Sequence, residues 1–148
     1  MPYEFKLERR VEFAETDMAG IVHFSNFFRY MEATEHAFFR SLGHSLHTDV
    51  DGGMQGWARV HAACDYKAPL RYQDLFEVRL VVREKRKTAF AYDFYFTKDG
   101  SVVARGELTV VHVARKAGEE ELRPAPMPAA IDAAIEVAPP ELLETRNA

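Results

Sequence analysis

Residues 13–31, FAETDMAGIVHFSNFFRYM, place acidic side chains just before an apolar segment that begins like a helix. Asp17 precedes Gly20, and the apolar run starts near Phe24. The first N–H groups of a helix lack intrahelical partners, so they can stabilise a carbonyl oxygen that becomes negative during acyl transfer. A carboxylate beside them can attack the carbonyl or activate water. Because aspartate before a helix is also a common cap, residue types alone favour the capping role.

The composition is typical of a globular protein of one domain. The chain has 148 residues, of which 47% are hydrophobic and 28% charged, and a net charge of −4. Its basic residues are spread out, which argues against nucleic acid as the main partner. It has no run of about 18 apolar residues and no signal-peptide pattern at its N-terminus, so neither a membrane span nor secretion is expected. Cys64 is the single cysteine, so no intrachain disulfide can form, and we expect a cytoplasmic protein.

The spacing of apolar residues predicts one long helix and five strands. A helix is expected over 24–42, ended by Gly43. Its apolar stripe comprises Phe24, Phe28, Met31, Phe38 and Leu42. Alternating or β-rich segments predict strands over 4–13, 57–68, 76–85, 89–97 and 102–114. One antiparallel sheet with one buried helix satisfies this order, which is an α+β fold.

The end of the chain differs in composition from the rest. Five of the seven prolines fall between residues 124 and 140. We therefore expect one domain over residues 1–127, followed by a C-terminal tail over 128–148 with room for a short helix.

The segment VEFAETDMAGIVHFSNFFRYMEATEHAFF resembles the start of the hotdog-fold acyl-CoA thioesterases. It is most similar to the group that holds 4-hydroxybenzoyl-CoA thioesterase and the acyl-CoA thioesterases associated with the Tol-Pal system. The family pattern is D-x-x-G-[IV]-V, two ring or polar residues, and then a small residue, Asn and Tyr or Phe. It is matched here by Asp17, Gly20, Ile21, Val22, Ser25, Asn26 and Phe27. The segments DYKAPLRYQD and REKRKTAF resemble two further turns of the family, and the resemblance covers about residues 5–127.

The resemblance implies a single hotdog domain, with a five-stranded antiparallel sheet wrapped around one long central helix. It implies hydrolysis of acyl-CoA thioesters to free acid and CoA, with Asp17 as nucleophile or general base. It also implies that the backbone N–H groups of Phe24 and His23 polarise the thioester carbonyl, and that Gly20 and Asn26 lie at the substrate. No metal or redox cofactor is implied. The expected assembly is a homodimer or homotetramer with its sites between subunits.

A basic turn, KRKT at residues 85–88, separates two of the expected strands. CoA carries a pyrophosphate and a 3′-phosphate, and short basic turns suit such anions. Arg86, Lys87 and Thr88 are therefore candidate CoA-binding residues, although a run of charges is usually only a solvated hairpin.

Other residues have a functional and a simpler interpretation. Glu35 falls on the apolar stripe, where a charge is costly unless paired. It is either a second carboxylate of the site or, as we favour, the partner of an arginine or of a backbone group of a neighbouring subunit. The His23 imidazole is interpreted as part of an exposed loop, and Cys64 as a buried structural thiol. His44 and His47 have no evident third ligand, so no metal site is expected.

Two alternative functions remain. A hotdog hydratase or dehydratase would show a D-x-N-x-x-H type of pattern, and no histidine follows Asp17 at that spacing. A non-catalytic acyl-thioester binding protein would not need a carboxylate next to the thioester. The sequence leaves open the acyl group, and whether its carrier is CoA or an acyl carrier protein.

Overall fold

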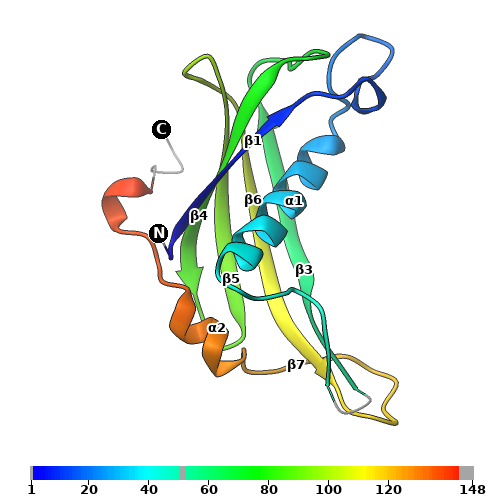
Figure 1. Ribbon diagram of the computed structural model, residues 1–148, viewed down its shortest axis with the longest axis vertical. Helices are drawn as coiled ribbons and strands as arrows, with labels where there is room; N and C mark the ends of the chain where they lie inside the picture. Colours follow the sequence, from blue (N-terminus) through cyan, green and yellow to red (C-terminus); the bar gives the residue numbers. More distant parts are fainter. Residues whose placement is uncertain (1, 51–52, 144–148) are drawn as a thin grey trace.

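The computed structural model describes residues 2–50 and 53–143 as a curved antiparallel sheet wrapped around a helix (Figure 1). Its five long strands are β1 (Glu4–Arg10), β3 (Gly53–Tyr66), β4 (Leu75–Lys85), β5 (Ala89–Lys98) and β6 (Ser101–Arg115). The order of the sheet from one edge is β1-β4-β5-β6-β3 and then β2 (Thr48–Val50), while β7 (Arg123–Pro124) pairs with β6.

Two short strands, β2 (Thr48–Val50) and β7 (Arg123–Pro124), make the sheet seven-stranded within the described residues, where five strands were expected. Strands of two or three residues are too short to show an alternating pattern, so the sequence carries no signal for them.

The long helix, α1, spans Asn26–Ser41, and is therefore shorter at both ends than the expected range. Ser25 occupies the N-cap position, but its side chain does not cap the helix N–H groups. At the other end, Gly43 has a φ of +82°, and its N–H donates to the Arg40 carbonyl at 2.9 Å. Glycine adopts this left-handed conformation without steric cost, which explains why the helix stops there.

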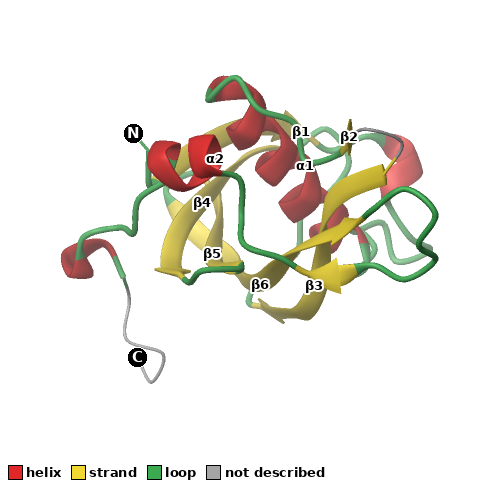
Figure 2. Ribbon diagram, turned by 90° about the horizontal axis from the view of Figure 1, so that it is seen from below, coloured by secondary structure: helices red, strands yellow, loops and turns green. Residues whose placement is uncertain are grey.

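α1 lies in the concave face of the sheet (Figure 2). Its Phe27, Met31 and Phe38 side chains are buried in one core with alternate residues of β5. Those residues are Phe90, Tyr92, Phe94 and Phe96, all fully buried. The Met31 side chain of α1 packs against Gly106 of β6, where an added Cβ would lie 2.4 Å from Met31 Cε. A side chain at position 106 would therefore have to displace the Met31 thioether.

The C-terminal segment packs against the other elements as far as residue 143. It contains the short helix α2 (Ala129–Ala134) and a 3₁₀ turn, η2 (Pro140–Leu142). Ile135 is fully buried, and the Ala138 N–H donates to the Val82 carbonyl of β4 at 2.9 Å. Within residues 2–50 and 53–143, no helix is long and apolar enough to cross a membrane.

The contact between Met31 and Gly106 predicts that Gly106→Val destabilises the fold. The valine methyl groups would occupy the space of the Met31 thioether, and overpacking of this kind lowers the free energy of unfolding by about 1–3 kcal/mol. Urea denaturation measures the change. Gly56→Ala is the control, because a Cβ there would meet only the Leu46 carbonyl, at 3.7 Å. An unchanged midpoint for Gly106→Val would contradict this close approach.

Candidate active site

Asp17 lies in a tight loop between β1 and α1. Its N–H donates to the Ile21 carbonyl at 2.8 Å, and the Gly20 N–H donates to the Asp17 carbonyl at 3.0 Å. Gly20 has a φ of +80°, so its part is to let the backbone turn. Asp17 Oδ1 accepts from the N–H of Ala19 at 2.8 Å and of Ile21 at 3.4 Å. These bonds fix the orientation of a half-buried carboxylate.

The loop is docked against the turn that precedes β4. The Val22 N–H donates to the Leu70 carbonyl at 2.7 Å, and Ile21 forms an isolated bridge with Arg71. The same loop is tied back to α1 through Asn26, whose buried side-chain Nδ2 donates to the Glu15 carbonyl at 2.8 Å. Asn26, expected at the substrate, therefore uses its amide N–H to hold the loop.

Near the start of α1, one backbone N–H is available to a substrate, and it belongs to a residue that precedes the helix. The first helical N–H groups are occupied by short-range bonds, such as that from Asn26 to the His23 carbonyl at 2.9 Å. The His23 N–H donates to the Glu15 carbonyl at 2.9 Å, which corrects the expectation that it polarises a substrate. Among the residues that the structure describes, the Phe24 N–H has no protein acceptor. Phe24 is thus the candidate oxyanion donor.

The His23 imidazole bonds within its own turn. Its Nδ1 lies 2.8 Å from Ser25 Oγ and accepts from the Ser25 N–H at 3.3 Å. The ring is exposed and does not line the cavity described next.

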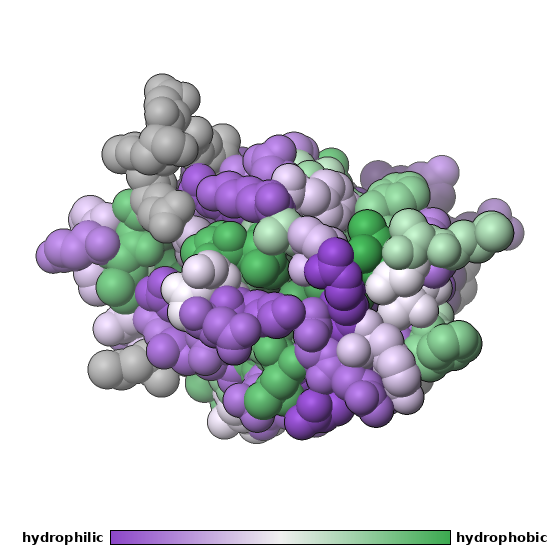
Figure 3. All heavy atoms as spheres, turned by 90° about the horizontal axis from the view of Figure 1, so that it is seen from above, coloured by the Kyte–Doolittle hydropathy of each residue, from purple (hydrophilic) through white to green (hydrophobic). Residues whose placement is uncertain are grey.

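An open cavity of about 420 Å³ joins Asp17 and Phe24. Its walls are mostly apolar and come from the Asp17 loop, the first turn of α1 and the end of β3. They include Ile21, Phe27, Tyr66, Lys67 and Pro69. Figure 3 shows this end of the molecule, where hydrophobic surface lies between hydrophilic residues. The arrangement offers a carboxylate and a free N–H to a substrate whose apolar part fills the cavity.

Arg86, Lys87 and Thr88 lie at the opposite end of the sheet (Figure 1). The Asp17 loop contacts the turn before β4, whereas the basic turn follows β4, a strand of 11 residues. At about 3.3 Å per residue, the two are about 35 Å apart. The structure does not bring the basic turn to the Asp17 cavity of the same chain.

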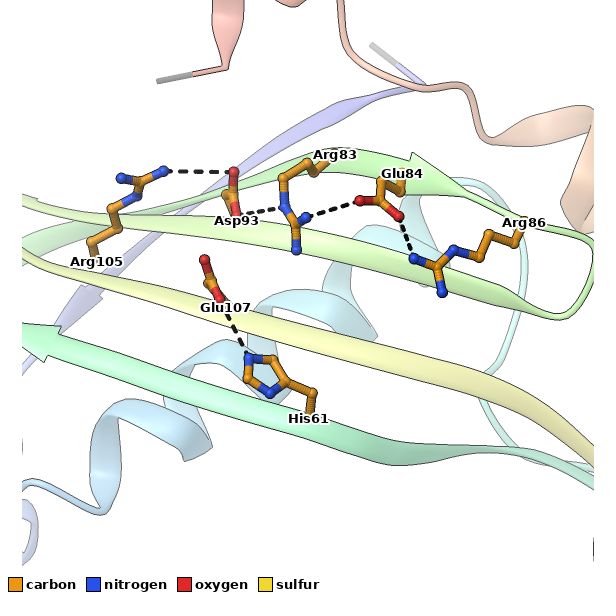
Figure 4. A network of polar contacts seen from close by, with 7 residues as sticks. All are labelled: His61, Arg83, Glu84, Arg86, Asp93, Arg105 and Glu107. Atoms are coloured by element: carbon orange, nitrogen blue, oxygen red, sulfur yellow. Dashed lines mark hydrogen bonds and ion pairs between the residues drawn. The ribbon is translucent and has the colours of Figure 1, made fainter. Parts of the chain in front are cut away.

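Part of the charge of the basic turn is already paired. Arg86 Nη2 lies 2.7 Å from Glu84 Oε2, and Glu84 also contacts Arg83 (Figure 4). Arg83 and Arg105 flank Asp93, which is fully buried on the face of β5 away from α1. Any phosphate bound at Arg86 would therefore share this guanidinium with Glu84.

The backbone of the basic turn forms hydrogen bonds with β6 and with the segment before α2. The Thr88 carbonyl accepts from the His112 N–H at 2.7 Å, and the Lys87 carbonyl accepts from the Met127 N–H at 3.1 Å.

Glu35 is completely buried in the middle of α1. Its carboxyl accepts a hydrogen bond from Arg59 of β3 and lies beside the Tyr92 hydroxyl of β5. The expected arginine partner of Glu35 is therefore Arg59, which belongs to the same chain. Burial raises the pKa of Glu35 from 4.5 to about 7, although Arg59 acts in the opposite direction. Glu35 does not line the Asp17 cavity.

Two residues of the site had no signal of their own in the sequence. Tyr66 is the last residue of β3; it lines the cavity, and its hydroxyl donates to the Phe24 carbonyl at 3.0 Å. Glu15 accepts from the Tyr30 hydroxyl at 2.9 Å and holds the loop to α1. Tyr66 is the second residue of the segment DYKAPLRYQD, and Glu15 stands two positions before Asp17. Both were visible only as parts of motifs.

The thiol and imidazole groups that were considered form no further site. Burial raises the pKa of Cys64 to about 11, which makes its thiol a poor nucleophile. Across the described ranges, no group of three or more His, Cys, Asp or Glu side chains could hold a metal ion.

Several known proteins are similar to this chain in sequence and in fold. The family model of the thioesterase-like superfamily matches residues 11–135. A 1,4-dihydroxy-2-naphthoyl-CoA thioesterase from Synechocystis is 27% identical, with 89% of this chain and 95% of that one covered and a TM-score of 0.78. A gentisyl-coenzyme A thioesterase is 29% identical, with 86% and 98% covered and a TM-score of 0.73. A hypothetical protein from Aquifex aeolicus is 36% identical, with 74% and 88% covered and a TM-score of 0.67. The expected hotdog fold is confirmed.

The buried Glu35 carboxyl predicts a pH effect on stability. The folded chain keeps a proton that the unfolded chain releases between pH 4.5 and about 7, so the contribution of Glu35 to stability falls as pH rises through that range. Glu35→Gln removes this loss. Its free energy of unfolding relative to the parent should therefore rise by up to about 3 kcal/mol between pH 4.5 and pH 8.

Urea denaturation of parent and variant at each pH measures this difference, with the exposed Glu120→Gln as the control. A difference between Glu35→Gln and the parent that does not change with pH would mean that folding does not raise the pKa of Glu35.

Proposed function

The chain belongs to the thioesterase-like superfamily, and we propose that it hydrolyses acyl-CoA thioesters to a free acid and CoA with Asp17 and the Phe24 N–H as its working groups. The observation that carries this proposal is their meeting at one apolar cavity, a fixed carboxylate on one side and a backbone donor without an acceptor on the other.

In the proposed reaction, the thioester carbonyl oxygen accepts a hydrogen bond from the Phe24 N–H, which stabilises the negative charge that develops there. Asp17 Oδ1 is held by backbone N–H groups, which leaves Oδ2 to act. It either attacks the carbonyl carbon to give a mixed anhydride that water opens, or takes a proton from the water that attacks. Either way the C–S bond breaks, and CoA leaves as a thiol. These steps call for no metal or redox cofactor.

The acyl group is proposed to be a hydroxylated aromatic acid. Two of the similar solved structures are named for CoA esters of such acids, gentisyl-CoA and 1,4-dihydroxy-2-naphthoyl-CoA. The cavity supports the same choice, because the rings of Phe27 and Tyr66 line it together with Ile21 and Pro69. Aromatic rings pack well edge to face against such walls.

The working form is proposed to be a pair of chains joined along β3. Beyond its pairing with β2 at Gly53–Gln55, the outer edge of β3 over residues 56–66 has no strand neighbour in the described parts of the chain. An open edge of this length invites pairing with a second copy.

Such a pair would bring a basic turn to each Asp17 cavity. Antiparallel pairing of two β3 strands sets the Tyr66 end of one beside the opposite end of the other. The basic turn is level with that opposite end, because Ala89 pairs with Val111 and Val111 pairs with Ala58. The CoA phosphates would then be bound by the partner chain. A cytoplasmic location is also proposed, since a single cysteine indicates no structural disulfide.

The proposed role of Asp17 predicts that Asp17→Asn loses activity while keeping substrate affinity. The amide has the same shape but can neither attack nor take a proton. General-base assistance is worth about 10²–10⁴ in rate, so kcat should fall by at least about 100-fold. Thiol release is measured with benzoyl-, naphthoyl-, hexanoyl- and palmitoyl-CoA.

Asp99→Asn, on the exposed hairpin between β5 and β6, is the control. A parental rate for Asp17→Asn would refute the assignment. A parent chain that binds these esters without releasing thiol would support the binding-protein alternative.

The two-chain site predicts complementation between variants. Arg86→Ala/Lys87→Ala should raise KM by at least about tenfold, because contacts to phosphate far from the reacting carbon bind ground state and transition state alike. Hybrids that pair this variant with Asp17→Asn carry one site with an intact Asp17 and an intact partner turn. Dual-tag purification isolates these hybrids, and they should hydrolyse substrate with the parental KM.

The homodimers of each variant are the controls. A hybrid that keeps the raised KM would mean that the turn serves the site of its own chain. A parental KM for the Arg86→Ala/Lys87→Ala homodimer would mean that the turn binds no CoA.

A further inference from the structure

Tyr66 joins two elements on either side of the candidate cavity. It ends β3, and its ring packs edge-on against Phe27 of α1, with 5.0 Å between ring centroids and an angle of 80°. Its hydroxyl donates to the Phe24 carbonyl at 3.0 Å. Nearly half of Tyr66 is exposed, and yet both its ring and its hydroxyl are engaged.

The Phe24 N–H shares its peptide unit with the His23 carbonyl, and this carbonyl accepts from the Asn26 N–H at 2.9 Å. One unit earlier, the His23 N–H donates to the Glu15 carbonyl. On the other side, the Phe24 carbonyl accepts from the Phe27 N–H at 3.4 Å, a long bond for this type. The bond from Tyr66 is the shorter of the two at this carbonyl, and it approaches from a different strand. It therefore restrains the peptide unit that follows Phe24, and together with the bond to the His23 carbonyl it limits rotation about the φ and ψ of Phe24.

From this geometry, and resting on the function proposed above, we propose that Tyr66 is a positioning residue that orients the Phe24 N–H toward the thioester carbonyl. Tyr66 acts through Phe24 and takes no part in proton transfer. Burial raises the pKa of Tyr66 to about 12, so its hydroxyl remains a donor at neutral pH. An oxyanion donor is effective only when its direction is fixed before the charge develops.

The test compares Tyr66→Phe with Tyr72→Phe. Both changes remove one hydroxyl from a tyrosine of similar exposure, but Tyr72 pairs with Phe13 outside the cavity. The substrate is the acyl-CoA that the parent turns over fastest in the panel above. For Tyr66→Phe, kcat should fall roughly five- to tenfold, the usual effect of one neutral hydrogen bond, with KM within about twofold. Tyr72→Phe should keep both constants, and both variants should keep the parental melting temperature.

A second readout reports on the N–H itself. A ketone analogue of benzoyl-CoA, with a methylene in place of the sulfur and ¹³C at the carbonyl, is bound to each protein. The carbonyl resonance should shift downfield on binding to the parent and to Tyr72→Phe, and by clearly less on binding to Tyr66→Phe. A purely structural role for Tyr66 would leave this shift unchanged.

The outcomes separate the two proposals. A parental kcat and a parental carbonyl shift for Tyr66→Phe would overturn the role of Tyr66 while leaving the thioesterase proposal intact. A raised KM with an unchanged kcat would also overturn it, because Tyr66 would then only bind substrate. If the parent cleaves no acyl-CoA, the proposed function fails, and the carbonyl shift alone decides whether Tyr66 orients the Phe24 N–H.

Discussion

The position of the candidate site depends on Glu15, which fastens the loop before α1 to the helix itself. The Glu15 carbonyl accepts from the His23 N–H at 2.9 Å and from Asn26 Nδ2 at 2.8 Å, and its carboxylate accepts from the Tyr30 hydroxyl at 2.9 Å. Burial and the nearby Glu15 carboxylate raise the pKa of Tyr30, so the phenol stays protonated and remains the donor. At about 1 kcal/mol for each bond, the three bonds contribute about 3 kcal/mol to holding the loop against α1.

The clamp decides which backbone group is left for a substrate. The helix start satisfies its own first N–H groups through turn-like bonds, and Glu15 occupies the N–H of His23. Phe24 is left between these two sets of bonds, with its N–H free and its carbonyl held by Tyr66. The backbone donor that faces the cavity at this end of α1 is therefore the N–H of Phe24, a residue that precedes the helix. Asp17 is fixed separately, by the N–H groups of Ala19 and Ile21, so the acid and the donor are positioned independently.

Local patterns allowed the strands to be predicted well. β4 and β5 each lie within one residue of the expected ranges 76–85 and 89–97, since alternating apolar residues report burial directly. The site was predicted in part, because the Asp17 motif is also local. Tyr66 and Glu15 act through contacts with residues 42 and 15 positions away, which no spacing reveals. The basic turn was grouped with Asp17, although the two lie at opposite ends of β4.

The contrast between the centre and the edge of the sheet explains why one chain would leave the site unfinished. β5 is buried on both faces, and even Asp93 is tolerated there because Arg83 and Arg105 flank it. The cavity instead lies by the open edge of β3, where Phe24 is 62% exposed. Water screens the electrostatic interactions of a carboxylate and of an N–H donor with a substrate, so excluding water strengthens these interactions. A second chain along β3 would therefore do more than supply phosphate-binding residues, because covering the cavity would also make Asp17 and the Phe24 N–H more effective.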